Sequence, residues 1–509
     1  MSNTALAQPD EFLGHPKGLF VLFFTEMWER FSYYGMRALL VLYLTKHFLF
    51  GDKEASLIYG SYGSLVYAMP LIGGLIADRY LGYRKAVTFG AVLLVLGHFG
   101  MAFEGPAAQL IGGEVVRSGI HTQAFYLSLA FIIVGVGFLK ANISTIVGQL
   151  YGVTDPRRDG GFTIFYMGIN IGAFTATLAC AYLGETYGWK YGFGLAGIGM
   201  LFGLLVFQVF RSHLQGYGEP PAPEFLTERV APFLTREQLI YGVGFISVIA
   251  IWQIIQRTSE LGFALLALGT IVVVWTIWFS LQKCTVIERD RMLVMLILII
   301  ASVFFWALFE QAGSSLTLFT DRNIDKGNLT AGMFQAFNPF FIIVCAPLFA
   351  WLWVKLSASG LEPTTPAKFG LGIIQVGLGF AVLVYGASHA DENGNVALIW
   401  LALMYFFHTT GELCLSPVGL SMVTKLSVQR VAAMMMGVWF LSSAFASYAG
   451  GIIAGAMAIE ESAGETIDAA TSLLVYTTVF EKLAIVAMVL GVFMLLISPL
   501  LHKRMHGVH

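Results

Sequence analysis

Six polar or ionisable side chains recur along one face of the first long apolar segment. Their steps of three and one residues match a single face of an α-helix, and they are Glu26, Glu29, Arg30, Tyr33, Tyr34 and Arg37. VLFF precedes this face and ALLVLYL follows it, so the segment is apolar enough to cross a membrane. A charge at the bilayer centre costs about 2.5–3.5 kcal/mol. The face must therefore line a protein interior or a water-filled cavity, either as the route of an ion or substrate or as a structural salt-bridge cluster.

Three further ionisable residues each stand alone in apolar sequence, namely Lys140, Glu310 and Glu412. Together with Arg37 they form two groups of opposite charge. Arg37 and Lys140 are cationic and lie in the first half of the chain, whereas Glu310 and Glu412 are anionic and lie in the second. A zwitterion one to three residues long separates its charges by about 3.5 Å per residue. Such a molecule could bridge the two groups.

The elements that position these residues are membrane helices. The chain has 509 residues, of which 57% are hydrophobic and 12% charged, whereas soluble domains carry about 25% charged residues. Fourteen apolar segments between residues 18 and 500 are long enough to cross a bilayer. All of them must be helices, because lipid-exposed backbone cannot remain unpaired and no barrel-type alternation is present. The predicted class is an all-α integral membrane protein.

The distribution of Lys and Arg predicts the orientation. An even number of spans places both termini on one side, and most loop Lys and Arg residues lie on that side. The positive-inside rule therefore predicts a multi-pass protein of the cell (inner) membrane with cytoplasmic N- and C-termini. The polar start, MSNTALAQPDEFLGHPKG, lacks the pattern of a signal peptide and is expected to be a cytoplasmic tail.

A proline-containing inner connection divides the chain into two halves. The pair of spans that follows it carries charge only around its turn, at Arg257 and Glu260, and is expected to be a lipid-facing insertion. The predicted organisation is a cytoplasmic tail at 1–17, a six-helix bundle at 18–211, a cytoplasmic linker at 212–237, a transmembrane hairpin at 238–282, a second six-helix bundle at 283–501 and a cytoplasmic tail at 502–509.

Three motifs carry a resemblance to known transporters. GGLIADRYLGYRKAVTFG, residues 73–90, resembles a loop pattern of the major facilitator superfamily, although an ordinary positively charged inner loop could read similarly. EMWERFSYYG, residues 26–35, resembles the ExxERFxYYG signature of proton-dependent oligopeptide transporters, and FYMGINIG, residues 165–172, resembles their FYxxINxG segment. The resemblance covers essentially the whole chain. It implies the superfamily fold of two six-helix bundles plus an inserted hairpin, and symport of di- and tripeptides with protons by alternating access.

The resemblance also implies a substrate site. It places the peptide carboxylate towards Arg37 and Lys140 and the peptide amine towards Glu412. The other candidate substrate-binding residues are Tyr33, Tyr34, Tyr67, Asn170, Trp306, Asn338, Ser416 and Trp439. Alternatives remain open for two of them, since Asn338 stands beside Pro339 and could serve helix-turn chemistry, and Tyr67 could be a packing residue.

The acidic residues are the expected proton sites. Glu26 and Glu29 share Arg30, which leaves an excess negative charge, so one of the two carboxylates is expected to hold a proton. Glu310 is expected to alternate between protonation and pairing with Arg37. We predict that an Arg37–Glu310 pair closes the outer side and that a Lys140–Glu412 pair helps to close the inner side.

Other function classes find little support. The sequence contains no HExxH, GxSxG or Asp-rich metal cluster that would indicate an enzyme or a metal site, and no repeated filter segment that would indicate a channel. No basic run suggests nucleic-acid binding. We expect no cofactor besides protons as the coupling ion, no protein partner, and function as a monomer in the lipid bilayer. The remaining alternative is a proton-coupled transporter of another small anion, such as nitrate, on the same fold.

Overall fold

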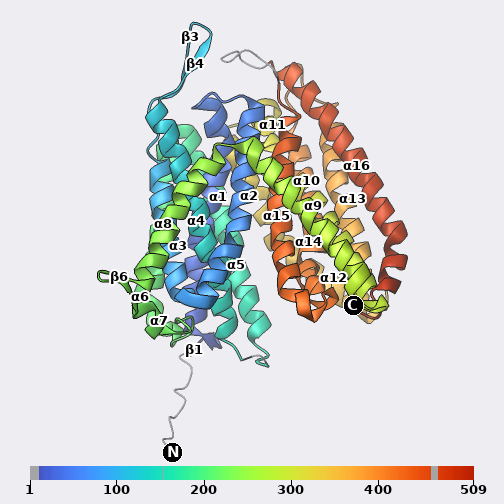
Figure 1. The fold of residues 1–509 in the computed structure, drawn as a ribbon. Helices are drawn as coiled ribbons and strands as arrows, with labels where there is room; N and C mark the ends of the chain where they lie inside the picture. Colours follow the sequence, from blue (N-terminus) through green and yellow to red (C-terminus); the bar gives the residue numbers. More distant parts are fainter. Residues whose placement is uncertain (1–10, 153, 460–467, 509) are drawn as a thin grey trace, which may run out of the picture.

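The structure, a computed structural model, describes residues 11–152, 154–459 and 468–508 and consists of two groups of long helices side by side (Figure 1). The first group comprises α1 (Lys17–Lys46), α2 (Asp52–Ile76), α3 (Tyr83–Met101), α4 (Gly119–Gln149), α5 (Arg158–Tyr187) and α6 (Trp189–Phe210). The second group comprises α10 (Val286–Phe309), α11 (Ser315–Asn323), α12 (Phe337–Ala358), α13 (Thr365–Ala387), α14 (Leu398–Leu426), α15 (Ala432–Gly455) and α16 (Ala469–Arg504). We call the face at which α1 begins and α16 ends the terminal face, and the other one the opposite face.

Short elements complete the described chain. The helical turns are η1 (Ala77–Leu81), η2 (Arg211–Leu214), η3 (Glu310–Gly313), η4 (Ala331–Ala336), η5 (Gln429–Val431) and α7 (Pro223–Thr227). Three two-stranded antiparallel sheets pair β1 (Glu11–Phe12) with β2 (His15–Pro16), β3 (Gln109–Ile111) with β4 (Glu114–Val116), and β5 (Arg229–Ala231) with β6 (Leu234–Thr235). None of these elements is long enough to cross a bilayer by itself.

The number of membrane-crossing helices agrees with the sequence. Among the described residues, 13 helices are long and apolar enough to span a membrane by length and composition. α1 differs from them by its charged face, but its 30 residues extend about 45 Å and lie inside the first group. Counting α1, the predicted all-α integral membrane fold of fourteen spans is confirmed.

One predicted span is interrupted at a candidate site residue. The sequence predicts a single helix over 292–319, but α10 ends at Phe309, and η3 and α11 follow. The backbone turns at Ser314, which has φ −126° and ψ −98°. Glu310 therefore lies at the C-terminal end of α10 and not in the middle of a regular helix.

Two helices, α8 (Arg236–Ile255) and α9 (Thr258–Lys283), form a hairpin that spans both groups. α8 packs against α4, and α9 crosses the molecule diagonally and packs against α10 (Figure 1). Phe263, Ile271 and Val274 on α9 are 74%, 64% and 60% exposed. Large apolar side chains with this exposure suit contact with lipid.

The loop after α2 is held to the connection between the halves. Gly82 has a φ of +71°, and a Cβ there would lie 2.5 Å from the Pro220 nitrogen. The Arg84 backbone N–H donates to the Gly218 carbonyl at 2.8 Å, and the Arg84 guanidinium donates to Glu219. Gly82 lets the connecting segment pack on the loop, because only glycine leaves room for that backbone.

The two groups touch at the level of the backbone where α2 crosses α15. A Cβ at Gly60 would lie 2.9 Å from both the Gly451 Cα and the Ser447 carbonyl oxygen. Small residues at such a crossing allow the helices to approach closely and form extensive van der Waals contact. This contact belongs to the half of the molecule near the opposite face.

The crossing predicts a sensitive glycine. Gly60→Ala should lower the free energy of unfolding by about 1–3 kcal/mol, because the methyl group meets backbone atoms that cannot move aside. Thermal unfolding of the detergent-solubilised protein measures the effect as a lower Tm. Gly74→Ala is the matched control on the same helix, since nothing lies within 4 Å of its added Cβ. Equal Tm values for the two variants would contradict the proposed crossing.

Candidate functional site

The charged face of α1 points into the protein. Glu26, Glu29 and Arg30 are 3%, 0% and 4% exposed. Arg30 forms ion pairs with both carboxylates, and its Nε lies 3.1 Å from Glu26 Oε1. Glu26 Oε2 and Glu29 Oε1 accept no hydrogen bond from any described residue. Two carboxylates thus share one cation, and a proton can compensate the remaining buried negative charge.

An ion pair joins the two helix groups next to this cluster. Arg37 Nη2 on α1 donates to Glu310 Oε2 at 2.5 Å, and Arg37 Nε donates to the Tyr59 hydroxyl on α2. Arg37 and Glu310 are 8% and 9% exposed. The structure therefore brings together the two residues that we expect to pair, and the break after α10 gives Glu310 its position at η3.

Two tyrosines connect the pair with the cluster. The rings of Tyr33 and Tyr34 meet edge to face with their centroids 5.2 Å apart. The Arg30 guanidinium carbon lies 5.3 Å from the centroid of Tyr33, and that of Arg37 lies 5.9 Å from the centroid of Tyr34. Cation–π contacts of this kind stabilise buried guanidinium groups. The α1 face is one continuous polar array.

The other two isolated charges have different partners. Asn338 Nδ2 on α12 donates to Glu412 Oε2 at 2.9 Å and to Thr409 Oγ1 at 3.1 Å. Lys140 Nζ on α4 lies 4.4 Å from the ring centroid of Tyr67. In the described part of the chain, Lys140 and Glu412 form no ion pair with each other in this conformation. A Lys140–Glu412 pair stays a prediction for a conformation in which the terminal face is closed.

A cavity of about 270 Å³ lies between the two groups. Its wall consists of Tyr67, Lys140, Trp306, Glu310, Leu415, Ser416, Trp439, Phe440 and Ser443. Six candidate residues thus meet around one space, with a cation from the first group and a carboxylate from the second. The two indoles provide apolar surface beside these charges. Such a wall suits a small ligand that carries both charge and apolar parts.

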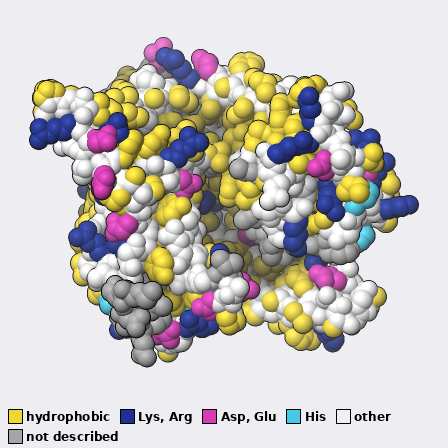
Figure 2. All heavy atoms as spheres, turned by 60° about the horizontal axis from the view of Figure 1, so that its bottom comes forward, with side chains coloured by type: hydrophobic (Ala, Val, Ile, Leu, Met, Phe, Trp, Pro, Cys, Tyr) yellow, Lys and Arg dark blue, Asp and Glu magenta, His cyan; other side chains and the backbone are white. Residues whose placement is uncertain are grey.

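A larger cavity continues from this one towards the terminal face. It measures about 840 Å³, shares Tyr67, Lys140 and Phe440 with the first, and reaches Asp78 and Arg158. Figure 2, in which the lower side of Figure 1 is turned forward, shows this side hollowed between the two groups, with charged side chains around the hollow. The site is therefore accessible from the terminal face.

The opposite face is closed by contacts between the groups. Arg322 on α11 makes two hydrogen bonds with Asp52 on α2, at 2.6 and 2.8 Å. Lys46 at the end of α1 forms a 2.7 Å ion pair with Asp321. The sequence analysis did not predict these ion pairs or the hydrogen bond between Arg37 and Tyr59. The paired residues are up to 275 positions apart, and no local pattern relates them.

One candidate residue has a more local environment. Asn170 is 5% exposed, and its Nδ2 donates to the Tyr166 carbonyl in the same helix at 3.1 Å. Within the described chain, it is not among the residues that line the cavity at Lys140. The structure places Asn170 on α5 but does not bring it to that wall.

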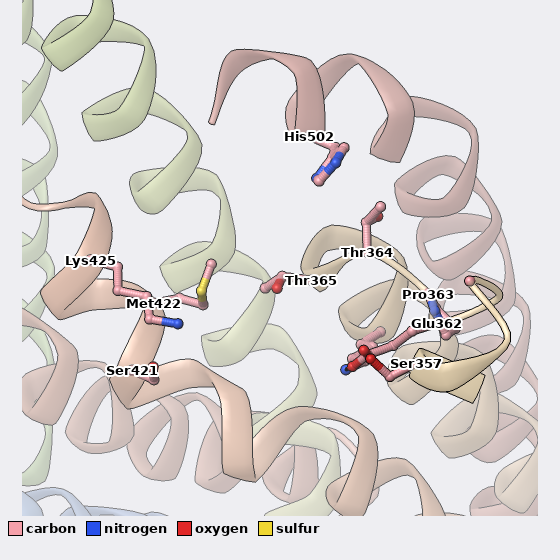
Figure 3. A pocket seen from close by; sticks show the side chains of 11 residues that line it. Ser357, Glu362, Pro363, Thr364, Thr365, Ser421, Met422, Lys425 and His502 are labelled. Carbon is pink, nitrogen blue, oxygen red and sulfur yellow. Dashed lines mark hydrogen bonds and ion pairs between the residues drawn. The ribbon is translucent and has the colours of Figure 1, made fainter. Parts of the chain in front are cut away.

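A separate cavity of about 680 Å³ opens at the terminal face within the second group. Figure 3 shows Glu362, Thr364 and Thr365 on one side of it and Lys425 and Met422 on the other. The Lys368 ammonium group donates to Glu362 Oε1 at 2.5 Å, and this hydrogen bond lowers the pKa of the Glu362 carboxyl from its usual value. None of the candidate site residues lines this cavity.

Known proteins resemble the chain over nearly its whole length. A family model described as "POT family" matches residues 84–469. The peptide transporter YePEPT of Yersinia enterocolitica subsp. palearctica serotype O:3 (strain YE-P4) is 37% identical, over 87% of this chain and 88% of its own. Dipeptide and tripeptide permease A of Escherichia coli (strain K12) is 32% identical, over 96% of this chain and 93% of its own.

A solved structure extends the likeness to three dimensions. The crystal structure of peptide transporter POT in complex with sulfate has a TM-score of 0.80 and 37% sequence identity, and the match covers 98% of each chain. The family model, the relatives and this structure agree with the family resemblance inferred from the sequence. The chain belongs to the POT family, the proton-dependent oligopeptide transporters.

Proposed function

We propose that this protein is a proton-coupled symporter that imports di- and tripeptides by alternating access. The observation that carries the proposal is the cavity between the two helix groups, with Lys140 on one wall and Glu310 on the other. The names of its relatives, a peptide transporter and a dipeptide and tripeptide permease, support this substrate class. Members of this family are transporters and not enzymes.

The peptide binds with its charged ends at opposite groups. Its carboxylate meets Arg37 and Lys140, and its amine meets Glu412, which is 9% exposed and receives one hydrogen bond from Asn338. Trp306 and Trp439 contact the peptide side chains, and Ser416 offers a hydroxyl in the same wall. Tyr33, Tyr34, Tyr67 and Asn170 complete the set of proposed substrate-binding residues. Because Glu412 lies in low-dielectric surroundings, a cationic amine there compensates a charge that is costly when unpaired.

Protons act through two sets of carboxylates, which are Glu310 and the pair Glu26 and Glu29. A proton on Glu310 weakens its pair with Arg37, which frees the guanidinium for the peptide carboxylate. The Glu26–Glu29–Arg30 cluster is the second proposed proton site, since it holds excess negative charge. One proton that crosses an inside-negative membrane releases about 2.3 kcal/mol per 100 mV. This free energy shifts a two-state equilibrium about fifty-fold.

Transport requires the two groups to alternate between a conformation that is open at the terminal face and one that is open at the opposite face. We assign the bundles to 18–211 and 283–501, with the linker at 212–237 and the hairpin at 238–282 between them. If the termini at 1–17 and 502–509 are cytoplasmic, the open terminal face corresponds to an inward-open state. In the outward-open state, the Arg37–Glu310 pair separates and Lys140 pairs with Glu412. The protein works as a monomer in the inner membrane, with protons as the coupling ion.

The alternative is a proton-coupled transporter of another small anion, such as nitrate. A small inorganic anion can use Arg37 and Lys140 but gains nothing from a buried carboxylate at Glu412. Glu412 is hydrogen-bonded to Asn338 and precedes Ser416 of the cavity wall by one helical turn on α14, and this position favours a zwitterion.

Uptake into proteoliposomes tests the function directly. Labelled dialanine should accumulate above its external concentration when an inward proton gradient is imposed, and should only equilibrate without the gradient. Nitrate uptake is measured in the same vesicles. Gradient-driven nitrate accumulation without dialanine accumulation would establish the alternative.

Glu310→Gln should separate exchange from proton coupling. Counterflow of dialanine should persist, because the cavity is retained, whereas uptake driven by the proton gradient should fall to the level without a gradient. Glu362→Gln is the control, since Glu362 lies in the separate cavity of Figure 3 and should keep driven uptake. Full driven uptake by Glu310→Gln would remove Glu310 from the coupling path.

Glu412→Gln should weaken binding of peptides that have a free amine. The loss of one charge-assisted contact corresponds to about 1.5–3 kcal/mol, or about a ten- to hundred-fold higher Kd. N-acetylated dialanine lacks the cationic amine, so its affinity should change little. Binding is measured by competition against labelled dialanine. An equal decrease for both peptides would reject Glu412 as the amine site.

A further inference from the structure

Glu185 makes an unusual contact near the end of α5, at the opposite face. Its Oε1 accepts a hydrogen bond from the Gly332 backbone N–H at 2.8 Å, and its Oε2 accepts one from the Ala331 N–H at 3.2 Å. These N–H groups belong to the first two residues of η4, which continues into α12 as one helical span from Ala331 to Ala358. Glu185 belongs to the first helix group and this span to the second.

The carboxylate supplies a helix cap that the span itself lacks. The first N–H groups of a helix have no partner within the helix, and they carry the positive end of its dipole. Thr330 precedes the span, but its side chain makes no capping hydrogen bond. The negatively charged Glu185 therefore takes this role from the neighbouring group, across the junction that must open and close.

The cap forms only while the two groups are closely packed at this face. A Cβ at Gly332 would lie 2.8 Å from the Ala181 Cβ and 3.0 Å from the Ala38 carbonyl oxygen. The start of the span thus lies directly against the α1 backbone and the Ala181 side chain of α5. Further along the same junction, the rings of Phe174 on α5 and Phe340 on α12 lie 6.3 Å apart. If the groups separate at this face by a few ångströms, both hydrogen bonds are lost.

We propose that Glu185 is a gating residue of the transport cycle, whose carboxylate stabilises the closed state of the opposite face by capping the Ala331–Ala358 span. The proposal rests on the proposed function, since it requires this face to open. Asp52 and Lys46 bind charged side chains of the second group. Glu185 instead binds backbone N–H groups, and the partial positive charge of these groups cannot be reversed by substitution of a side chain.

The distance between the two groups at the opposite face provides the test. Spin labels replace Glu54 and Asn328, which are exposed positions in the first and second groups, in the full-length protein with its native cysteines removed. Pulsed electron spin resonance in lipid nanodiscs then measures the ratio of open to closed molecules. Glu185→Gln keeps the side-chain size but removes the charge and points an amide N–H at one of the two donors. The ratio should rise about ten-fold.

Glu104→Gln is the matched control. Glu104 Oε2 accepts a hydrogen bond from the Lys190 backbone N–H at 2.8 Å, at the start of α6. It is the same chemistry at the same face, but both partners lie in the first group, so the ratio should stay as in the wild type. Gly332→Ala provides a second variant with Glu185 intact, and its methyl group should also raise the open population.

The outcomes separate the two proposals. A wild-type ratio in both Glu185→Gln and Gly332→Ala would overturn the gating role, as would an equal increase in Glu104→Gln. A wild-type protein that shows one fixed distance at every pH, with and without dialanine, would overturn alternating access, and the role of Glu185 with it.

Discussion

A buried ion pair between two helix groups is the interaction on which the rest of the structure depends. Arg37 and Glu310 carry opposite charges at a depth where an unpaired charge is costly, and the structure pairs each with the opposite charge on the other group. Removal of either charge leaves the other without compensation. A ligand or a proton that replaces one partner therefore weakens the contact between the groups directly. A local change in charge thereby alters the stability of the arrangement of the two groups.

The contacts at the two faces are unequal. At the opposite face, the Asp52–Arg322 and Lys46–Asp321 pairs, the Gly60–Gly451 crossing and the Glu185 cap all lie between the groups. Towards the terminal face, a cavity of about 840 Å³ lies beside Lys140. Among the described residues, these contacts hold the groups together at the opposite face, whereas the cavity beside Lys140 lies towards the terminal face. A carrier that reverses this difference needs contacts that are individually weak enough to break, which suits several separate hydrogen bonds and ion pairs.

The elements outside the two groups connect them without filling the site. α8 rests on the first group and α9 on the second, while the connecting segment is fastened to the loop at Gly82 and Arg84. These attachments leave the cavity wall to residues of the two groups. The exposed apolar surface of the hairpin faces outward, where lipid contact has no energetic cost.

The sequence alone determined the membrane class, the inward direction of the α1 face and the family, because each depends on composition or local periodicity. A stripe of charges at helical spacing can face only a polar interior, wherever the other helices lie. The tertiary structure decided what local patterns cannot encode. Only in the folded structure is the span interrupted at Glu310, and only there does Arg37 donate a hydrogen bond to the Tyr59 hydroxyl. The pairing of Asp52 with Arg322 and the position of Glu185 at the start of a distant helix are likewise tertiary contacts. It also left Lys140 and Glu412 with other partners in this conformation. These contacts join residues far apart in the chain, so their geometry arises only when the helices pack.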